Sequence, residues 1–194
     1  MRAAELNRKT AETDVEISLN IDGNGKSSIH SGIGFFDHML TLLAAHGSFD
    51  LNVACKGDTE VDGHHSIEDI GITLGDAFKE ALGTKERISR YGSFYLPMDE
   101  ALAFVALDIS GRPFLVYDGG AMTPMIGDYD SELTEEFLRA FAFHASITLH
   151  VKILYGTNSH HKVEAIFKAL GHALKTACSI DPALSGVLST KGVL

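Results

Sequence analysis

The sequence predicts an α+β fold made of two tandem, duplicated ββαβα halves with helices packed on sheets, and three observations support this. The pattern His-His-x-x-Glu occurs twice, starting at His64 and at His160. A shift of 96 residues aligns HHSIEDIGITLGDAFKEA with HHKVEAIFKALGHALKTA, and a shift of 98 aligns DHMLTLLAAHGSFDLNV with EEFLRAFAFHASITLHV. In both copies, stretches with strand-like and helix-like apolar spacing follow in the same order. Such a repeat decides the architecture, because each copy forms the same supersecondary unit.

The first copy begins with a strand and a turn. Residues 15–21 alternate between apolar and polar side chains, which is typical of a half-buried strand. The Asp-Gly-Asn-Gly run at 22–25 is a turn signal, so residues 27–30 are expected to return as the hairpin partner. A helix at 35–45, a strand at 49–55 and a helix at 64–82 complete this copy.

The second copy repeats this order. Ser131 is expected to be the N-cap of its first helix, and Glu135 and Glu136 follow where the positive end of the helix dipole favours acids. Residues 92–98 are a candidate for one additional strand. The other predicted elements are strands at 102–109, 114–117 and 149–155 and helices at 131–143 and 160–178.

The composition is that of an ordinary globular chain. Its 194 residues suffice for a single catalytic unit of two pseudo-symmetric halves, about 1–88 and 89–182, followed by a C-terminal tail at 183–194. A net charge of −10 argues against nucleic acid as a partner. No apolar run reaches the roughly 18 residues of a membrane span, and the N-terminus lacks the apolar core of a signal peptide. Cys55 and Cys178 make no disulfide framework, so a cytoplasmic location is expected.

The two His-His-x-x-Glu motifs have the spacing of metal ligands. Residues four apart lie on one face of a helix, so the first histidine of each motif can share an ion with its glutamate. The second histidine points about 100° away and can serve another ion. Imidazole nitrogens and carboxylate oxygens together suit Mn, Fe or Zn. The residues are His64, His65 and Glu68 in the first motif and His160, His161 and Glu164 in the second.

The repeat completes this ligand set. His38 lies in GFFDHML, and the shift of 98 residues places Glu136 at the equivalent position. Ligands from one chain and ligands from neighbouring subunits both satisfy the scheme. The pseudo-twofold relation favours mixed sets, with His64, Glu68, Glu136 and His161 on one ion and His160, Glu164, His38 and His65 on the other.

Five segments spread over nearly the whole chain carry a resemblance to a known family. They are GIGFFDHML, DGHHSIEDIGITLG, YLPMDEALAFVALDISGRP, NSHHKVEAIFKALGHAL and the C-terminal STKGVL. Together they resemble the imidazoleglycerol-phosphate dehydratase family of histidine biosynthesis. The resemblance implies removal of water from D-erythro-1-(imidazol-4-yl)glycerol 3-phosphate to give 3-(imidazol-4-yl)-2-oxopropyl phosphate. It also implies two Mn²⁺ ions per active site, halves related to the second domain of ribosomal protein S5, and a homo-oligomer of 24 subunits (a 24-mer).

The resemblance further implies roles for residues outside the metal set. Glu12 in TAET matches an acid near the reacting carbons, with a solvated strand-edge charge as the alternative. Asp99 in PMDE is a second candidate for acid–base work, with a turn role as the alternative, and His38 could shuttle a proton if it leaves the metal. The matched phosphate-binding residues are Arg90, Arg112, Lys168, Ser189 and Lys191.

Some assignments have competing interpretations. Lys168 is also spaced to form an ion pair with Glu164 on one helix. Many members of the family have histidine where this chain has Glu136, and because Mn²⁺ accepts both donors the change should tune affinity. The tail with Ser189 and Lys191 is expected to become ordered on substrate binding. Two other functions fit the ligand pattern: a different dinuclear metal-dependent phosphoester hydrolase, and a non-catalytic metal-binding shell protein.

Overall fold

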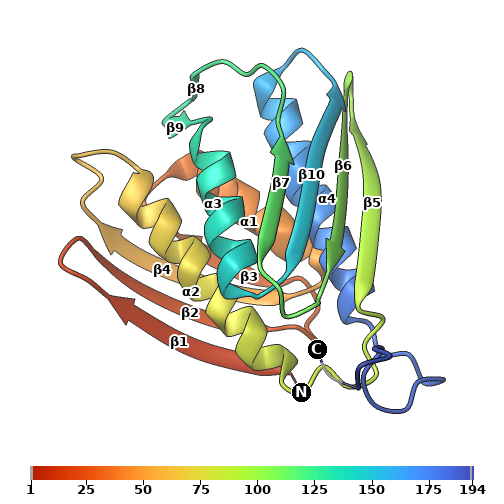
Figure 1. Cartoon of the computed structure of the whole chain (residues 1–194). Helices are drawn as coiled ribbons and strands as arrows, with labels where there is room; N and C mark the ends of the chain where they lie inside the picture. Colours follow the sequence, from red (N-terminus) through yellow and green to blue (C-terminus); the bar gives the residue numbers. More distant parts are fainter. Residues whose placement is uncertain (1, 193) are drawn as a thin grey trace.

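Two four-stranded sheets enclose a layer of four helices (Figure 1). The computed structural model describes residues 2–192 and 194. The first half contributes strands β1 (Ala3–Lys9), β2 (Thr13–Asn20), β3 (Ser27–His30) and β4 (Asp50–Gly57), with helices α1 (Gly34–Gly47) and α2 (His64–Leu82). The second half contributes strands β5 (Tyr91–Met98), β6 (Ala101–Asp108), β7 (Phe114–Asp118), β8 (Met125–Ile126), β9 (Tyr129–Asp130) and β10 (Thr148–Tyr155), with helices α3 (Leu133–His144) and α4 (Ser159–Cys178).

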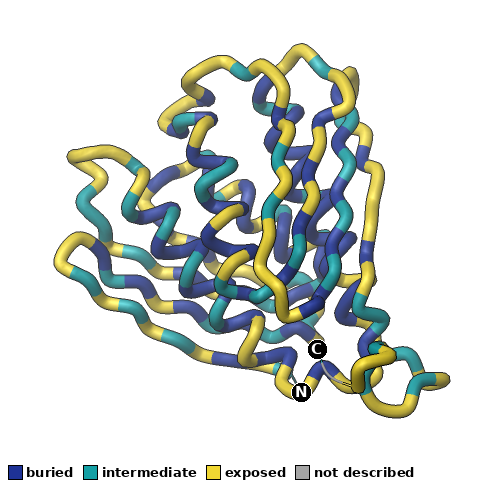
Figure 2. Tube along the Cα trace, viewed as in Figure 1, coloured by how far each residue is buried: buried dark blue, intermediate teal, exposed yellow. Residues whose placement is uncertain are grey.

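The two sheets have the same topology, and the predicted α+β class is confirmed. Their strand orders are β1-β2-β4-β3 and β5-β6-β10-β7. β3 runs parallel to β4 in the first sheet, and β7 runs parallel to β10 in the second. The other neighbouring strands are antiparallel. The buried sides of both sheets face the helices, and the outer sides are largely exposed (Figure 2). The halves therefore share one architecture about a pseudo-twofold axis.

Each half opens with one strand more than the predicted ββαβα order. The candidate strand at 92–98 is confirmed as β5, whereas β1 was not expected from the sequence. In β1, Ala4 is the one buried residue and Leu6 is half-buried, because β1 is an edge strand. Its apolar signal is therefore too weak to stand out. The short β8–β9 pair between β7 and α3 was also not predicted.

The predicted hairpin at 27–30 is wrong in its pairing. These residues form β3, but β3 pairs in parallel with β4, and β2 pairs with β1 and β4. The turn at 22–25 is responsible, because Asp50 Oδ1 accepts hydrogen bonds from the amides of Asn24 (2.8 Å) and Lys26 (3.1 Å). These bonds tie the chain to the start of β4 and direct β3 to its free edge.

The predicted N-cap of α3 is also wrong. The helix begins at Leu133 with Glu132 as its N-cap, and no side chain caps it. Ser131 precedes the N-cap by one residue and is buried, and its carbonyl accepts a hydrogen bond from the amide of Thr134 (3.2 Å). The acids expected near the helix start are present, because Glu135 and Glu136 lie in the first turn.

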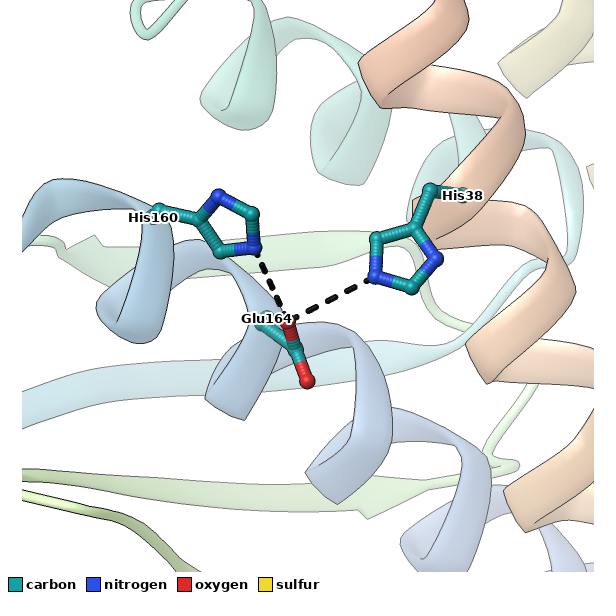
Figure 3. Close-up of side chains that lie close together, drawn as sticks. All are labelled: His38, His160 and Glu164. Atoms are coloured by element: carbon teal, nitrogen blue, oxygen red, sulfur yellow. Dashed lines mark hydrogen bonds and ion pairs between the residues drawn. The ribbon is translucent and has the colours of Figure 1, made fainter.

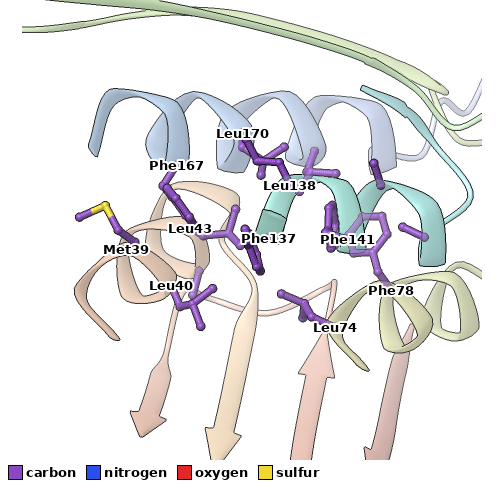
Figure 4. Packing of buried hydrophobic residues seen from close by; sticks show 14 of the residues in the cluster. Met39, Leu40, Leu43, Leu74, Phe78, Phe137, Leu138, Phe141, Phe167 and Leu170 are labelled. Atoms are coloured by element: carbon purple, nitrogen blue, oxygen red, sulfur yellow. The ribbon is translucent and has the colours of Figure 1, made fainter. Parts of the chain in front are cut away.

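The helical layer packs through aromatic side chains from both halves (Figure 4). Phe137 of α3 is fully buried, with its ring centroid 5.2 Å from that of Phe36 on α1 and 5.3 Å from that of Phe167 on α4. Burying one such side chain contributes about 1.5–3 kcal/mol. Because these contacts join helices of both halves, the two halves share one core.

Two glycines let helices of different halves approach closely. A Cβ on Gly171 of α4 would lie 2.8 Å from the carbonyl oxygen of Leu43 and 2.9 Å from the amide of Gly47, both on α1. A Cβ on Gly75 of α2 would lie 2.8 Å from the carbonyl oxygen of Phe141 on α3. Gly75 and Gly171 are equivalent in the repeat, so the α1–α4 and α2–α3 pairs are related by the pseudo-twofold axis.

Candidate metal centre and substrate site

His38, His160 and Glu164 converge at the contact between α1 and α4 (Figure 3). Glu164 Oε2 lies 3.0 Å from Nε2 of His160 and 3.5 Å from Nε2 of His38. One ligand atom from each of the three residues lies within 4.8 Å of the others. These are three of the four residues that the repeat assigns to one ion. They come from both halves of the chain, so only the folded protein brings them together.

Local contacts fix the helix starts that carry these side chains. Asp128, between β8 and β9, accepts the amides of Gly34 (2.9 Å) and Phe35 (3.4 Å) at the start of α1. The ring of Phe35 then packs edge-on against His160, with centroids 5.0 Å apart. Asn158 caps α4 by accepting the amide of His161. The ligand cluster is thus attached to two capped helix ends.

The charges around the cluster favour the ionised form of Glu164. Burial is the largest influence and opposes ionisation of Glu164, but the hydrogen bonds and charges of Lys168, His160 and His38 together outweigh it, so the pKa of Glu164 is lowered. Lys168 Nζ lies 2.5 Å from Glu164 Oε1, which leaves Oε2 facing the two imidazoles. The alternative interpretation of Lys168, an ion pair with Glu164, is therefore present in the structure. An ionised carboxylate beside two imidazole nitrogens is a donor set for a divalent transition metal.

The second histidine of each motif lies in a different environment. His65 Nδ1 is 3.0 Å from Asp58 Oδ2, and its Nε2 is 3.8 Å from Glu12 Oε1. Hydrogen bonding to Asp58 is the main cause that raises the pKa of His65. Within the described part of the chain, His65 does not join the cluster of His38, His160 and Glu164.

His161 repeats this arrangement with different carboxylates. Its Nδ1 lies 2.7 Å from Glu100 Oε2, and its Nε2 lies 3.8 Å from Asp99 Oδ2. The hydrogen bond to Glu100 raises the pKa of His161, and the same bond together with the amide of Asn158 lowers the pKa of Glu100 to about 2. Glu12 and Asp99 both lie in the tight turn between the first two strands of their half. The two candidate acids therefore occupy equivalent places.

The other predicted ion has a looser set of ligands. His64 and Glu136 line a cavity of about 1070 Å³ between loops of the two halves, together with Asp62, Asp130 and Glu132. Glu68 is half-buried on α2 and is not among the residues that line it. Among the described residues, His64, Glu68 and Glu136 do not form a compact group like that of His38, His160 and Glu164.

Cations gather where the tail passes the end of the second sheet, at the start of β5 and the end of β6. Arg90 donates two hydrogen bonds to Asp108 (2.7 and 3.0 Å) and one to the carbonyl of Leu188 (2.7 Å). Arg112 lies 3.7 Å from the same carboxylate. Ser189 Oγ accepts the amide of Lys191 (3.2 Å) in a turn directly after Leu188. Four of the five predicted phosphate-binding residues thus lie on or beside one segment, while Lys168 lies at the metal cluster.

Sequence reasoning missed three carboxylates that organise the site. Asp58 and Glu100 bind the ring Nδ1 atoms, and Asp128 holds the start of α1. Glu100 follows Asp99 directly, so the acidic pair at a strand turn was an available signal. Asp58 and Asp128 lie in loops, where a single acid carries no recognisable pattern.

Comparison with known proteins gives a consistent result. A family profile described as imidazoleglycerol-phosphate dehydratase matches residues 31–174. A relative of that description from Clostridium novyi (strain NT) is 61% identical over 187 residues, covering 96% of this chain and 95% of that protein. Another from Acetivibrio thermocellus is 59% identical over 193 residues, covering 100% and 99%.

Solved structures agree with the sequence relatives. The imidazoleglycerol-phosphate dehydratase of Staphylococcus aureus subsp. aureus N315 superposes with a TM-score of 0.84 at 40% identity, covering 92% of this chain and 99% of that one. The enzyme of Pyrococcus furiosus, solved in complex with (S)-C348, also has a TM-score of 0.84, at 38% identity and 97% and 100% coverage. In the residues that the structure describes, no helix combines the length and apolar character needed to cross a membrane.

Proposed function

The chain belongs to the imidazoleglycerol-phosphate dehydratase family, and we propose that it works with two Mn²⁺ ions per active site, held between neighbouring subunits. It is a hydro-lyase of histidine biosynthesis (EC 4.2.1.19) that acts on imidazoleglycerol phosphate. The alternatives of a phosphoester hydrolase and of a non-catalytic shell are set aside, because full-length relatives at about 60% identity are dehydratases.

The observation that carries the metal proposal is the cluster of His38, His160 and Glu164. Its donors fit a divalent ion, because the carboxylate is ionised and both histidines direct Nε2 toward it. By the repeat, His64, Glu68 and Glu136 form the equivalent set for the other ion. Glu136 supplies an oxygen where many family members have an imidazole, which should tune affinity.

The fourth ligand of each ion is proposed to come from another subunit. His65 would complete the cluster of His38, His160 and Glu164, and His161 would complete the other set. The support is that neither histidine reaches its partners within the chain, while each directs Nε2 toward an exposed acid, Glu12 or Asp99. A site built in this way requires an oligomer.

An exposed apolar face supports such an oligomer. The outer side of the second sheet carries Tyr91, Tyr95, Phe114 and Val116, which are 52%, 60%, 58% and 41% exposed. The outer side of the first sheet carries polar residues instead, among them Glu5, Asn7, Glu16 and Ser18. The four apolar side chains lie on the two edge strands of the second sheet, β5 and β7, with exposed His150 and Lys152 of β10 between them. Because exposed apolar side chains often mark interaction surfaces, we assign this face to contacts in a homo-oligomeric shell of 24 subunits.

The site residues have distinct tasks in the proposed reaction. When bound, the ions supply Lewis acidity to the imidazole ring of the substrate. Glu12 is assigned the removal of the proton from C2, and Asp99 the donation of a proton to the hydroxyl that leaves C3. His38 is the alternative proton carrier.

The remaining assignments concern the phosphate and the location. Arginine suits bidentate phosphate binding, and lysine acts as a point charge. Arg90 donates to the carbonyl of Leu188, halfway along the 183–194 tail, and Arg112 lies near the same Asp108 carboxylate as Arg90. We propose that this tail orders over the phosphate, with the enzyme in the cytoplasm. The complete phosphate set is Arg90, Arg112, Lys168, Ser189 and Lys191.

One assay tests the metal dependence directly. Protein stripped with a chelator is incubated with imidazoleglycerol phosphate, with and without added Mn²⁺, and the ketone product is followed by its alkaline absorbance. The expected result is loss of turnover on stripping and recovery with Mn²⁺. Full turnover by a preparation that elemental analysis shows to be free of transition metal contradicts the proposal.

A further inference from the structure

We propose that Glu100 is a positioning residue that holds the imidazole of His161 with Nε2 directed outward to bind metal. This inference rests on the proposed role of His161 as a metal ligand. Glu100 Oε2 lies 2.7 Å from His161 Nδ1, which is hydrogen-bond distance. A carboxylate only accepts, so in the neutral imidazole the proton is on Nδ1 and the lone pair is on Nε2. A neutral imidazole must have this tautomer to bind a metal through Nε2.

The Glu100 carboxylate is itself held in place. Its Oε1 accepts the amides of Asn158 (2.6 Å) and Thr157 (3.0 Å) and the hydroxyl of Thr157 (3.3 Å). These donors lie immediately before α4, so Glu100 connects the β5–β6 turn to the start of that helix. Asn158 also accepts the amide of His161. Both the backbone and the ring of His161 are therefore fixed by one connected set of hydrogen bonds.

The other half contains the same ring orientation with a carboxylate of different origin. Asp58 follows β4 and lies 3.0 and 3.2 Å from Nδ1 of His65, whereas Glu100 lies in a strand turn. The repeat therefore did not copy the carboxylate, but both halves have one at Nδ1. In the described residues, no hydrogen-bond donor other than His65 contacts the Asp58 carboxylate, so Glu100 is the more firmly anchored of the two.

Replacing Glu100 with glutamine reverses the tautomer preference with little change in shape. The amide oxygen of the glutamine is expected to take the Oε1 position, because the amides of Thr157 and Asn158 require an acceptor there. The NH₂ group then faces His161 Nδ1 and donates to it, which favours the proton on Nε2. An imidazole protonated on Nε2 has no lone pair for the metal. Loss of such a supporting partner typically costs 10–100-fold in metal affinity.

The test is a double-mutant cycle on Mn²⁺ affinity, measured by titration of the chelator-stripped oligomer and by metal content after dialysis. The variants are E100Q, H161A and E100Q/H161A, with E86Q as an exposed control for the loss of one negative charge. Melting of the metal-free proteins checks folding. We expect E100Q to raise the Kd of the Mn²⁺ ion that His161 binds by roughly 10–100-fold. E86Q should leave this Kd unchanged, and the double variant should have the same Kd as H161A.

Three outcomes overturn the inference. Unchanged Mn²⁺ affinity in E100Q, when H161A weakens it, removes the positioning role and leaves the ligand set intact. A further loss from E100Q in the H161A background shows that Glu100 only supports the loop before α4. Unchanged affinity in H161A removes the ligand assignment itself, and the inference with it. If E100Q does not fold, the same cycle is run with Glu100→Asp, whose shorter side chain cannot reach both Asn158 and His161. Glu100→Asp must then weaken Mn²⁺ binding in the wild-type background and cause no further weakening in the H161A background.

Discussion

Substitution of Gly171 by alanine tests whether close packing of α1 on α4 builds the metal cluster. The added Cβ would lie 2.8 Å from the carbonyl oxygen of Leu43, while ordinary contact begins at 3.4 Å, so the helices must separate by about 0.6 Å. Overpacking of this kind costs about 1–3 kcal/mol, with the upper end expected because both contacted atoms are backbone and cannot rotate away. Alanine recovers about 1 kcal/mol through its helix propensity.

The balance of these effects is a destabilisation of about 2 kcal/mol, which lowers the melting temperature by roughly 4–8 °C for a chain of this size. The assay is thermal unfolding of metal-free protein at one fixed concentration, because oligomer stability depends on concentration. Thr41→Ala on α1 is the control for a substitution that adds no atom at the α1–α4 contact; it is exposed and loses the hydroxyl that donates to the Asp37 carbonyl. A melting temperature equal to or above that of the wild type would refute the packing argument. Mn²⁺ affinity should fall together with stability, because His38 moves away from Glu164.

Three other predictions follow from the site and the core. Truncation after Leu188 removes Ser189 and Lys191 and should raise the substrate KM by well over tenfold in steady-state assays, whereas an unchanged KM removes the tail from the phosphate site. Glu12→Gln should lower kcat by about 10²–10⁴-fold, the usual contribution of a positioned acid or base, with Mn²⁺ content unchanged, and a near-normal kcat shows that Glu12 is only a solvated charge. The third concerns His46 and His172, whose rings are hydrogen-bonded at 3.0 Å across α1 and α4. Burial is the main cause that lowers the pKa of both histidines. The charges of His172 and Lys168 lower the pKa of His46 further, while Glu164 opposes this. The charge of Lys175 lowers the pKa of His172 further. Because the unfolded chain then binds more protons below its ordinary pKa of about 6.5, stability should fall as pH drops below that value. His172→Gln, which keeps the hydrogen bond and cannot titrate, should show a flatter melting-temperature profile between pH 5 and 7, and an equally steep profile rules out this pair as the source.

The repeat made much of the fold predictable. The helix predicted at 64–82 is α2, and the other helices and the central strands lie within a few residues of their predicted positions. β1 was missed because an exposed edge strand needs few apolar residues, and the partner of β3 was missed because strand pairing depends on contacts distant in sequence. Local patterns predict which element forms, but not which neighbour it pairs with.

The candidate site was predictable to a different extent. Candidate ligand types and their pairing on helices followed from spacing, and the cluster of His38, His160 and Glu164 contains three of the four residues in the set derived from the pseudo-twofold relation. The carboxylates that orient the rings were not predictable, because Glu100 is separated from His161 by 61 residues and only folding brings them together. The position of His65 away from the cluster also follows only from the fold.

Complementation between inactive chains tests most directly whether one subunit completes the metal site of its neighbour. The H38A variant breaks the cluster but keeps His65, and the H65A variant keeps the cluster but lacks its fourth ligand. Each alone should be inactive. In a symmetric assembly, each site takes its cluster from one subunit and its His65 from another, at random from the two variants. When the variants are co-expressed in equal amounts, about a quarter of the sites should therefore be intact. Activity, and the Mn²⁺ ion bound at the cluster of His38, His160 and Glu164, should each recover to about a quarter of the wild-type level. Co-expressed oligomers with no more activity than either parent would show that the site is not shared between chains.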